Sequence, residues 1–163
     1  MFDGIHTIAK ARLAHPGDAE ALYACLLALE DDHALVPRDD ARVRDMVRRA
    51  CWNRGAAAGV IEQDGEIVAT AGVILGDLCW YSEVPALREI WFYVRREYRR
   101  SGALADALWA WMEEHREQIG RLSGKPVVLL TGPTCMKRLA AKMRWWARRS
   151  KLVTALYMVG TLP

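Results

Sequence analysis

Apolar residues spaced three and four apart dominate the early part of the chain. One such segment runs from Asp18 to about Glu30, after an opening strand within residues 7–14. A second runs from Asp39 or Asp40 to about Cys51. An aspartate stands at the start of each segment, where its carboxylate can accept a hydrogen bond from the first-turn amides. The pattern predicts two amphipathic helices.

The pattern then changes to strands. Residues 59–63 and 66–75 are rich in small and β-branched apolar side chains, and Asp64-Gly65 between them predicts a type I′ hairpin. We expect a polar and aromatic loop over residues 76–85. A third strand is expected over residues 87–94.

The second half of the chain alternates between the two kinds of element. We expect a helix from Ala103 to about Gln118, a buried strand over residues 126–131, a helix from residue 133 to about Arg149 and a last strand over residues 153–161. No internal repeat or linker divides the chain, so residues 1–163 are predicted to form a single domain. The fold class is α/β, with a mixed, mostly antiparallel sheet flanked by helices.

Composition narrows the class of protein. Of the 163 residues, 52% are hydrophobic and 26% charged, which is typical of a folded domain and not of a disordered chain. No apolar run approaches the roughly 20 residues of a membrane span, so no membrane association is expected. A net charge of +3 is too small to indicate a nucleic-acid partner. The four cysteines form no Cys-x-x-Cys pair and the histidines show no ligand spacing, so we expect no metal, reduced thiols and a cytoplasmic protein.

The segment from Val94 to Leu104 contains the most informative chemistry. It joins the end of a predicted strand to the start of a helix, where outward-facing amides and the helix dipole favour an anion. Gly102 lets the backbone approach a ligand closely, and Arg99 and Arg100 add full positive charges. A pyrophosphate would fit. An ordinary charged turn between strand and helix is the alternative interpretation.

This segment resembles the acetyl-CoA signature of the GNAT superfamily of N-acetyltransferases. The signature is a strand that ends in Val, then four residues, and then the motif Arg/Gln-x-x-Gly-x-Gly/Ala, which opens a helix. Val94, Arg99 and Gly102 fall in register with it, whereas Leu104 stands where the family has Gly or Ala. Residues 11–22 look like the family's opening strand and capped first helix, and the predicted hairpin looks like its second and third strands.

The resemblance implies acetyl transfer from acetyl-CoA to a primary amine, by direct attack in a ternary complex. The strands would splay after Val94 to form the cofactor cleft. Pantetheine would pair with the strand near Phe92 and Val94, where a backbone N–H would stabilise the oxyanion, and the pyrophosphate would lie on the turn. The cofactor-binding residues implied in this way are Phe92, Tyr93, Val94, Arg99, Arg100, Ser101, Gly102, Ala103 and Leu104.

The attacking amine must first lose a proton, which a carboxylate can accept. Glu89 is the predicted catalytic base, on the strand that would hold the acetyl group, with Glu83 as second choice; a structural carboxylate and an ordered water are the alternatives. The family commonly takes its general acid from a tyrosine on the helix after the fifth strand. This chain has Trp145 and Trp146 in that helix, so no general acid is assigned.

The acceptor is expected near two acidic segments, residues 30–33 and 77–83, where carboxylates and aromatic rings suit a small-molecule or peptide amine. Two other functions stay open. One is a catalytically weak or inactive GNAT-fold module that binds acyl-CoA or a protein. The other is a nucleic-acid-associated protein that uses the basic residues of segment 137–151, although a solvated helix explains them better. We also expect a homodimer that covers the apolar strand at residues 153–161.

Overall fold

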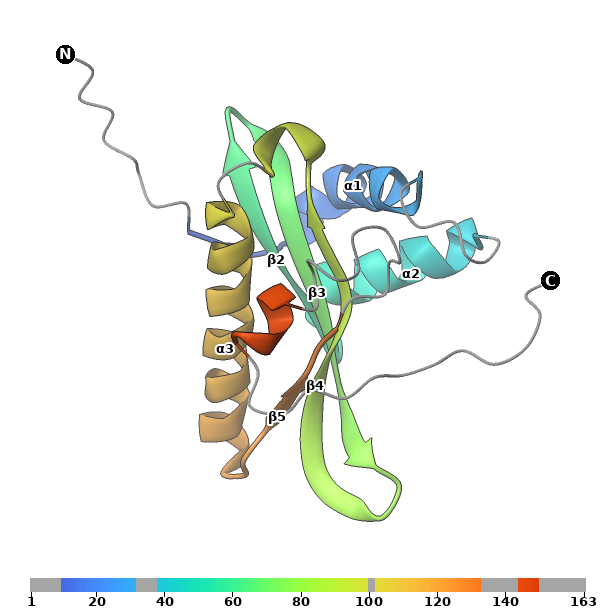
Figure 1. The fold of residues 1–163 in the computed structure, drawn as a ribbon. Coiled ribbons are helices and arrows are strands. Elements are labelled where there is room, and N and C mark those ends of the chain that lie inside the picture. The colour runs from blue at the N-terminus through green and yellow to red at the C-terminus, as the bar shows by residue number, and fades with distance from the viewer. Residues whose placement is uncertain (1–9, 32–37, 100–101, 133–143, 150–163) are drawn as a thin grey trace, which may run out of the picture.

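The computed structural model describes residues 10–31, 38–99, 102–132 and 144–149 (Figure 1). The elements in chain order are β1 (Arg12–Leu13), η1 (Pro16–Asp18), α1 (Ala19–Asp31), α2 (Asp40–Cys51), β2 (Ala56–Gln63), β3 (Glu66–Cys79), β4 (Ser82–Val94), η2 (Arg96–Tyr98), α3 (Ala103–Ser123) and β5 (Val128–Leu130). Residues 144–147 form a further helical turn.

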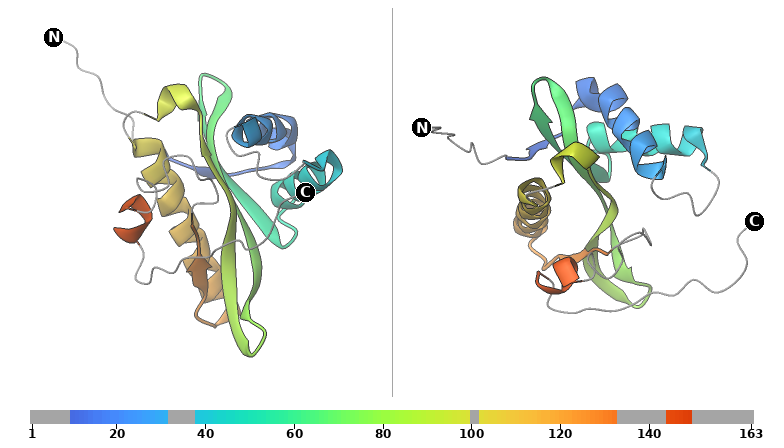
Figure 2. Two further views of the ribbon diagram at one scale, coloured as in Figure 1. Left: turned by 45° about the vertical axis from the view of Figure 1, so that its right-hand side comes forward. Right: turned by 45° about the horizontal axis from the view of Figure 1, so that its top comes forward.

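The five strands form one sheet in the order β1-β2-β3-β4-β5. All neighbours are antiparallel except β4 and β5, which run parallel. Two hydrophobic cores lie on its two faces: α1 and α2 pack on one, and α3 packs on the other with the turn that contains Trp146 (Figure 2). The predicted fold class is confirmed.

Two glycines in the sheet make room for tryptophan rings. A Cβ at Gly59 would overlap the Trp111 indole of α3, and one at Gly72 would overlap the Trp91 indole on the other face. The Trp91 Nε1–H donates to the buried Thr70 hydroxyl over 3.2 Å, so the indole is buried with its polar atom satisfied. These close contacts explain why strands so rich in small residues can anchor a dense core.

The predicted hairpin is confirmed, but the loop predicted to follow it is wrong. Asp64 and Gly65 have φ angles of 52° and 80°, as a type I′ turn requires. β3 continues past Leu75 to Cys79 and pairs with β4 as far as the Cys79–Ser82 register. The polar composition was misleading because both faces of this projecting ribbon meet water, so the apolar alternation of a half-buried strand is missing.

The second half differs in smaller ways. α3 extends to Ser123, beyond the expected end near Gln118. β5 has only three residues, all half-buried, where a buried strand over residues 126–131 was expected. The expected helix from residue 133 is described only over residues 144–149, and the expected last strand at residues 153–161 lies outside the described residues.

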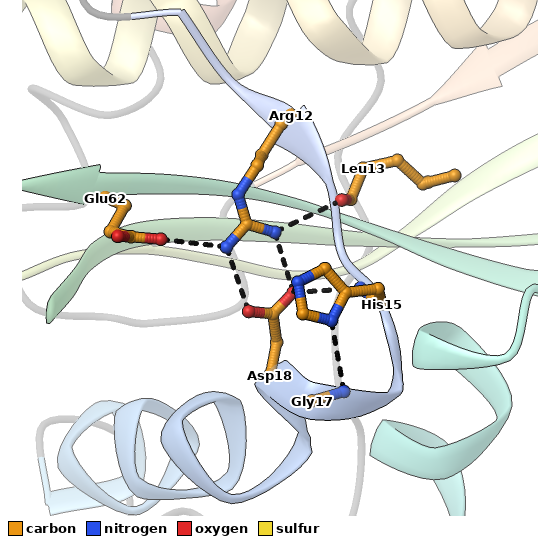
Figure 3. Close-up of polar contacts among 6 residues, drawn as sticks. All are labelled: Arg12, Leu13, His15, Gly17, Asp18 and Glu62. Carbon is orange, nitrogen blue, oxygen red and sulfur yellow. Dashed lines mark hydrogen bonds and ion pairs between the residues drawn. The ribbon is translucent and has the colours of Figure 1, made fainter. Parts of the chain in front are cut away.

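A polar network fixes β1 to the turn before α1 (Figure 3). Arg12 donates to both Asp18 carboxylate oxygens, over 2.7 and 2.9 Å, and to Glu62 on β2 over 2.9 Å. Asp18 also accepts from the His15 amide, so this aspartate closes a capping box one turn before α1 rather than capping α1 itself. The Arg12 hydrogen bonds lower the pKa of the Asp18 carboxyl, against the opposing effect of burial.

Candidate active site

The sheet opens between β4 and β5. Their last pair is Arg88 with Leu130, and from Glu89 onward β4 has no strand partner on that side among the described residues. The register of β4 with β3 skips Ile90 at this point, so Ile90 forms a bulge. Because a bulge bends its strand and increases the twist, it turns β4 away from β5. The strands therefore separate at Glu89, and the prediction that they separate after Val94 is wrong.

Glu89 lies where the two strands part. Its side chain is half-buried, and the Thr131 hydroxyl, one residue beyond β5, donates a hydrogen bond to Oε2. The predicted base is thus at the apex of the opening. Sequence reasoning missed Thr131 because 42 residues separate it from Glu89, and only the parallel pairing of β4 with β5 brings the two together.

Beyond the apex, the open edge of β4 presents backbone groups that have no strand partner among the described residues. The Arg95 amide donates to Val68 of β3 over 2.9 Å. Alternate residues of a strand face the same way, so the amides and carbonyls of Phe92 and Val94 point to the opposite, open edge. Tyr93 is placed differently from the prediction: its side chain is buried in the α1–α2 core, and its backbone faces β3.

The predicted phosphate turn leads from this edge into α3. Gly102 has a φ of 72°, α3 begins at Ala103, and space is open where a Gly102 side chain would be. Leu104, which departs from the signature, is buried in the α3 core, so its side chain leaves the turn clear. Arg100 and Ser101 lie outside the described residues.

No family model matches the chain, and no curated protein matches it. Solved structures do. A possible acetyltransferase from Clostridium difficile 630 matches at 14% identity and a TM-score of 0.68, covering 96% of this chain and 99% of its own. A predicted acetyltransferase with acetyl-CoA from Clostridium acetobutylicum matches at 13% and 0.64, over 93% and 95%. An aminoglycoside acetyltransferase from an uncultured soil metagenomic sample, in complex with sisomicin, matches at 16% and 0.63, over 98% and 99%. The chain has the GNAT acetyltransferase fold.

In this GNAT fold, Arg99 lies beside the open edge. Its Nε donates to the Val94 carbonyl over 2.6 Å, and its guanidinium lies 5.5 Å from the Tyr93 ring centre. Arg99 therefore covers one of the two backbone carbonyls that β4 directs to the open side. A ligand that pairs with this carbonyl must displace the arginine.

Four aromatic rings form one wall next to the open edge. They come from β4, from α3 and from the last described turn: Phe92, Trp109, Trp145 and Trp146. Arg149 stacks 4.0 Å from the Trp145 ring centre and pairs with Asp106 in the first turn of α3. An indole is not an acid, so the two tryptophans give the wall shape but no proton donor.

Neither acidic segment expected near the acceptor is shown beside Glu89. Residues 32–37 lie outside the described part. Glu83 lies at the far end of β4, six residues from Glu89 and so about 20 Å away at the rise of a strand. Trp80 and Tyr81 lie farther still, at the tip of the ribbon. A small amine at Glu89 cannot also contact them, and Glu83 is too distant to replace Glu89.

None of the helices among the described residues is both long and apolar enough to cross a membrane. The described residues also contain no group of three or more His, Cys, Asp and Glu side chains arranged to hold a metal ion.

Proposed function

We propose that the protein is an acetyl-CoA-dependent N-acetyltransferase acting on a primary amine by direct attack in a ternary complex. One observation supports this most strongly: the open edge of β4 begins at Glu89, and the chain continues from its end through η2 to a glycine turn that starts α3. The predicted base and the predicted anion-binding turn are thus joined by one strand edge that has no strand partner among the described residues. The matching structure with acetyl-CoA and the one with sisomicin support a thioester donor and an amine acceptor.

The residues present fit the cosubstrate. Acetyl-CoA supplies an activated acyl group, a peptide-like arm and phosphates. The backbone groups of Phe92 and Val94 suit the arm, and the space at Gly102 with the first amides of α3 suits the pyrophosphate. Arg99, once released from the Val94 carbonyl, adds a positive charge beside the phosphates.

Glu89 supplies the chemistry that the acceptor needs. An ammonium has no lone pair for attack, so Glu89 accepts a proton from it, directly or through water. The Thr131 hydroxyl donates to Oε2 and so fixes the position of the carboxylate that would accept the proton. Burial raises the pKa of the Cys25 thiol and raises that of Cys51 to about 11, so neither of these two thiols is a thiolate nucleophile at neutral pH.

A second candidate is a GNAT-fold module that binds an acyl-CoA without efficient turnover. The observation that favours it is the aromatic wall: Trp145 and Trp146 pack against Phe92 on the helix where a family member would offer a tyrosine. Neither indole can give the departing thiolate its proton.

Calorimetric titration with acetyl-CoA, followed by turnover on an amine panel, tests both candidates. The panel contains a polyamine, sisomicin and a peptide with a free N-terminus. We expect binding of acetyl-CoA and CoA, and CoA release that depends on one class of amine. Binding without turnover on any amine would favour the module. Absence of acetyl-CoA binding would refute both.

A further inference from the structure

A hollow of about 460 Å³ lies between β1 and the middle of α3. Residues 10–13 line it together with four residues of α3, which are Trp111, Glu114, His115 and Gln118. These four are spaced three and four apart, so they lie on one face of the helix. Binding sites for small molecules commonly measure about 300–1,000 Å³. This β1–α3 hollow is therefore large enough for a small ligand.

The β1–α3 hollow is separate from the opening between β4 and β5. β1 is first in the strand order and β4 is fourth, so about 14 Å separates the two strands. On α3, Trp111 comes eight residues after Ala103, which places it about 12 Å along the helix from the predicted phosphate turn. An inference about this hollow consequently does not rest on the proposed function.

An aromatic stack gives the hollow a fixed apolar surface. Gly59 of β2 leaves room for the Trp111 indole, which is 8% exposed. The His115 imidazole stacks on this indole, with 5.3 Å between the ring centres and an angle of 10° between the ring planes. Leu13 adds an aliphatic side chain and is 42% exposed. The apolar part of a ligand can pack here against side chains that the core already holds in place.

His115 also provides polar atoms. Burial lowers its pKa, so the ring is neutral at pH 7 and has one donor and one acceptor nitrogen. His115 takes part in no hydrogen bond or ion pair of the described residues. No fully buried side-chain nitrogen or oxygen in this part of the chain lacks a hydrogen-bond partner. The two ring nitrogens are therefore accessible, in a side chain that lines the hollow.

Opposite charges line the hollow without pairing. Lys10 and Glu114 are both exposed, and neither forms an ion pair or hydrogen bond within the part of the chain that the structure describes. Arg12 differs, because Asp18 and Glu62 neutralise its guanidinium (Figure 3). The described lining thus offers an available cation on the β1 side and an available anion on the α3 side.

We propose that the β1–α3 hollow binds a small zwitterion, an α-amino acid with an apolar side chain. The ligand carboxylate pairs with Lys10, its ammonium pairs with Glu114, and its side chain packs on the stack of Trp111 and His115. Gln118, one turn after Glu114, adds an amide that can donate or accept. A ligand with a single charge would leave either Lys10 or Glu114 without a partner, so the zwitterion complements the lining best.

Calorimetric titration with phenylalanine and three analogues tests each contact. N-acetylphenylalanine lacks the ammonium, phenylalaninamide lacks the carboxylate and glycine lacks the apolar side chain. We expect phenylalanine to bind with a Kd of about 1 mM or tighter, and each analogue to bind about threefold or more weakly. Absence of phenylalanine binding, or equal binding of all four compounds, overturns the proposal.

Two charge variants locate the contacts. Lys10→Gln should weaken phenylalanine binding about threefold or more and leave phenylalaninamide binding unchanged, because that probe has no carboxylate. Glu114→Gln should weaken phenylalanine binding equally and leave N-acetylphenylalanine binding unchanged. Both positions are exposed and unpaired in the described part, so neither change threatens the fold. Lys125→Gln and Glu83→Gln are the matched controls and should bind phenylalanine like wild type.

Phenylalanine is itself a primary amine, so the same titration is made with Glu89→Gln. We expect this variant, which alters the proposed acetyl-transfer site, to bind phenylalanine like wild type. Binding that Glu89→Gln abolishes and Lys10→Gln leaves intact would place the amino acid in the opening between β4 and β5, and would overturn the proposal.

Discussion

At the scale of single residues, the Glu89–Thr131 pair carries the proton transfer that we propose for the opening between β4 and β5. The carboxylate is half-buried at the point where β4 leaves β5, and one of its oxygens accepts the threonine hydroxyl. A carboxylate held in one rotamer by a neighbouring donor is a better placed proton acceptor than a mobile one. Substitutions can test the proton acceptor, Glu89, and its hydrogen-bond donor, Thr131, one at a time.

Replacing Glu89 by Gln keeps the shape and the hydrogen bond but removes the proton acceptor. We expect kcat to fall about 100-fold, with KM for acetyl-CoA unchanged. The loss should shrink at high pH, because the amine then deprotonates without help. Steady-state kinetics between neutral and alkaline pH measure this. An intact rate at neutral pH would make Glu89 a structural residue.

Thr131 is expected to act through Glu89 as a positioning residue. Thr131→Val keeps the volume but removes the donor, which should lower kcat about tenfold, the equivalent of one hydrogen bond to a charged group. Thr131→Ser restores the donor and should restore kcat. In the Glu89→Gln background the valine change should have little effect, since both side chains serve one function. Equal kcat values for the valine and serine variants would contradict the assignment.

At the scale of elements, the turn between β4 and α3 requires both an unusual backbone and an open space. Gly102→Val introduces strain at a φ of 72° and places a branched side chain where a pyrophosphate must approach. We expect the affinity for acetyl-CoA to fall at least tenfold in calorimetry. Gly124→Val is the matched control, because Gly124 has a φ of 67° at the other end of α3. If the two variants bind acetyl-CoA equally well, the turn does not hold the phosphates.

Two glycines of β3 differ in the space around them, so the effect of close packing can be measured apart from that of strand propensity. Gly72→Ala places a Cβ into the Trp91 indole, whereas the same change at Gly76 meets open space. We expect Gly72→Ala to cost about 1–3 kcal/mol of unfolding free energy, as overpacking does, and Gly76→Ala to be neutral or slightly stabilising. Urea unfolding of both variants measures the difference. Equal stabilities would show that Trp91 moves aside freely.

At the scale of the whole molecule, the Arg12–Asp18 pair gives stability a pH dependence. The Asp18 pKa is lower in the folded protein than in the unfolded chain, so the unfolded chain takes up the proton first. Stability from this pair is complete above about pH 4 and is lost as pH falls through the folded pKa. Burial lowers the pKa of His115, which removes further stability as pH falls below about 6.5.

Asp18→Asn should therefore destabilise the protein at pH 7 by about 1–2 kcal/mol and make a smaller difference at pH 3. The loss is small because the Arg12 side chain is 39% exposed, so water screens the pair. Glu62→Gln removes the other, more exposed partner of Arg12 and should cost less than about 0.5 kcal/mol. Urea unfolding at both pH values provides the comparison. A constant difference between wild type and Asp18→Asn would show that the pair is not the source of the pH dependence.

The features that depend on interactions between residues close in sequence could be predicted from the sequence alone. The positions of α1 and α2, the turn at Asp64-Gly65 and the glycine turn before α3 depend on periodicity, caps and backbone preferences that act within a few residues. The prediction of Glu89 as the base rests on a local property too, its short separation along the chain from that turn.

Only the tertiary structure decided the rest, because it depends on contacts between distant segments. The point of separation at Glu89 follows from a bulge against β3 and from where β5 stops pairing. The Thr131 hydroxyl reaches Glu89 across 42 residues, and Leu104 turns into the core because α3 packs on the sheet. Cross-strand pairing holds the ribbon beyond Leu75. Both faces of this ribbon meet water, so its sequence lacks the apolar alternation that would have predicted a strand.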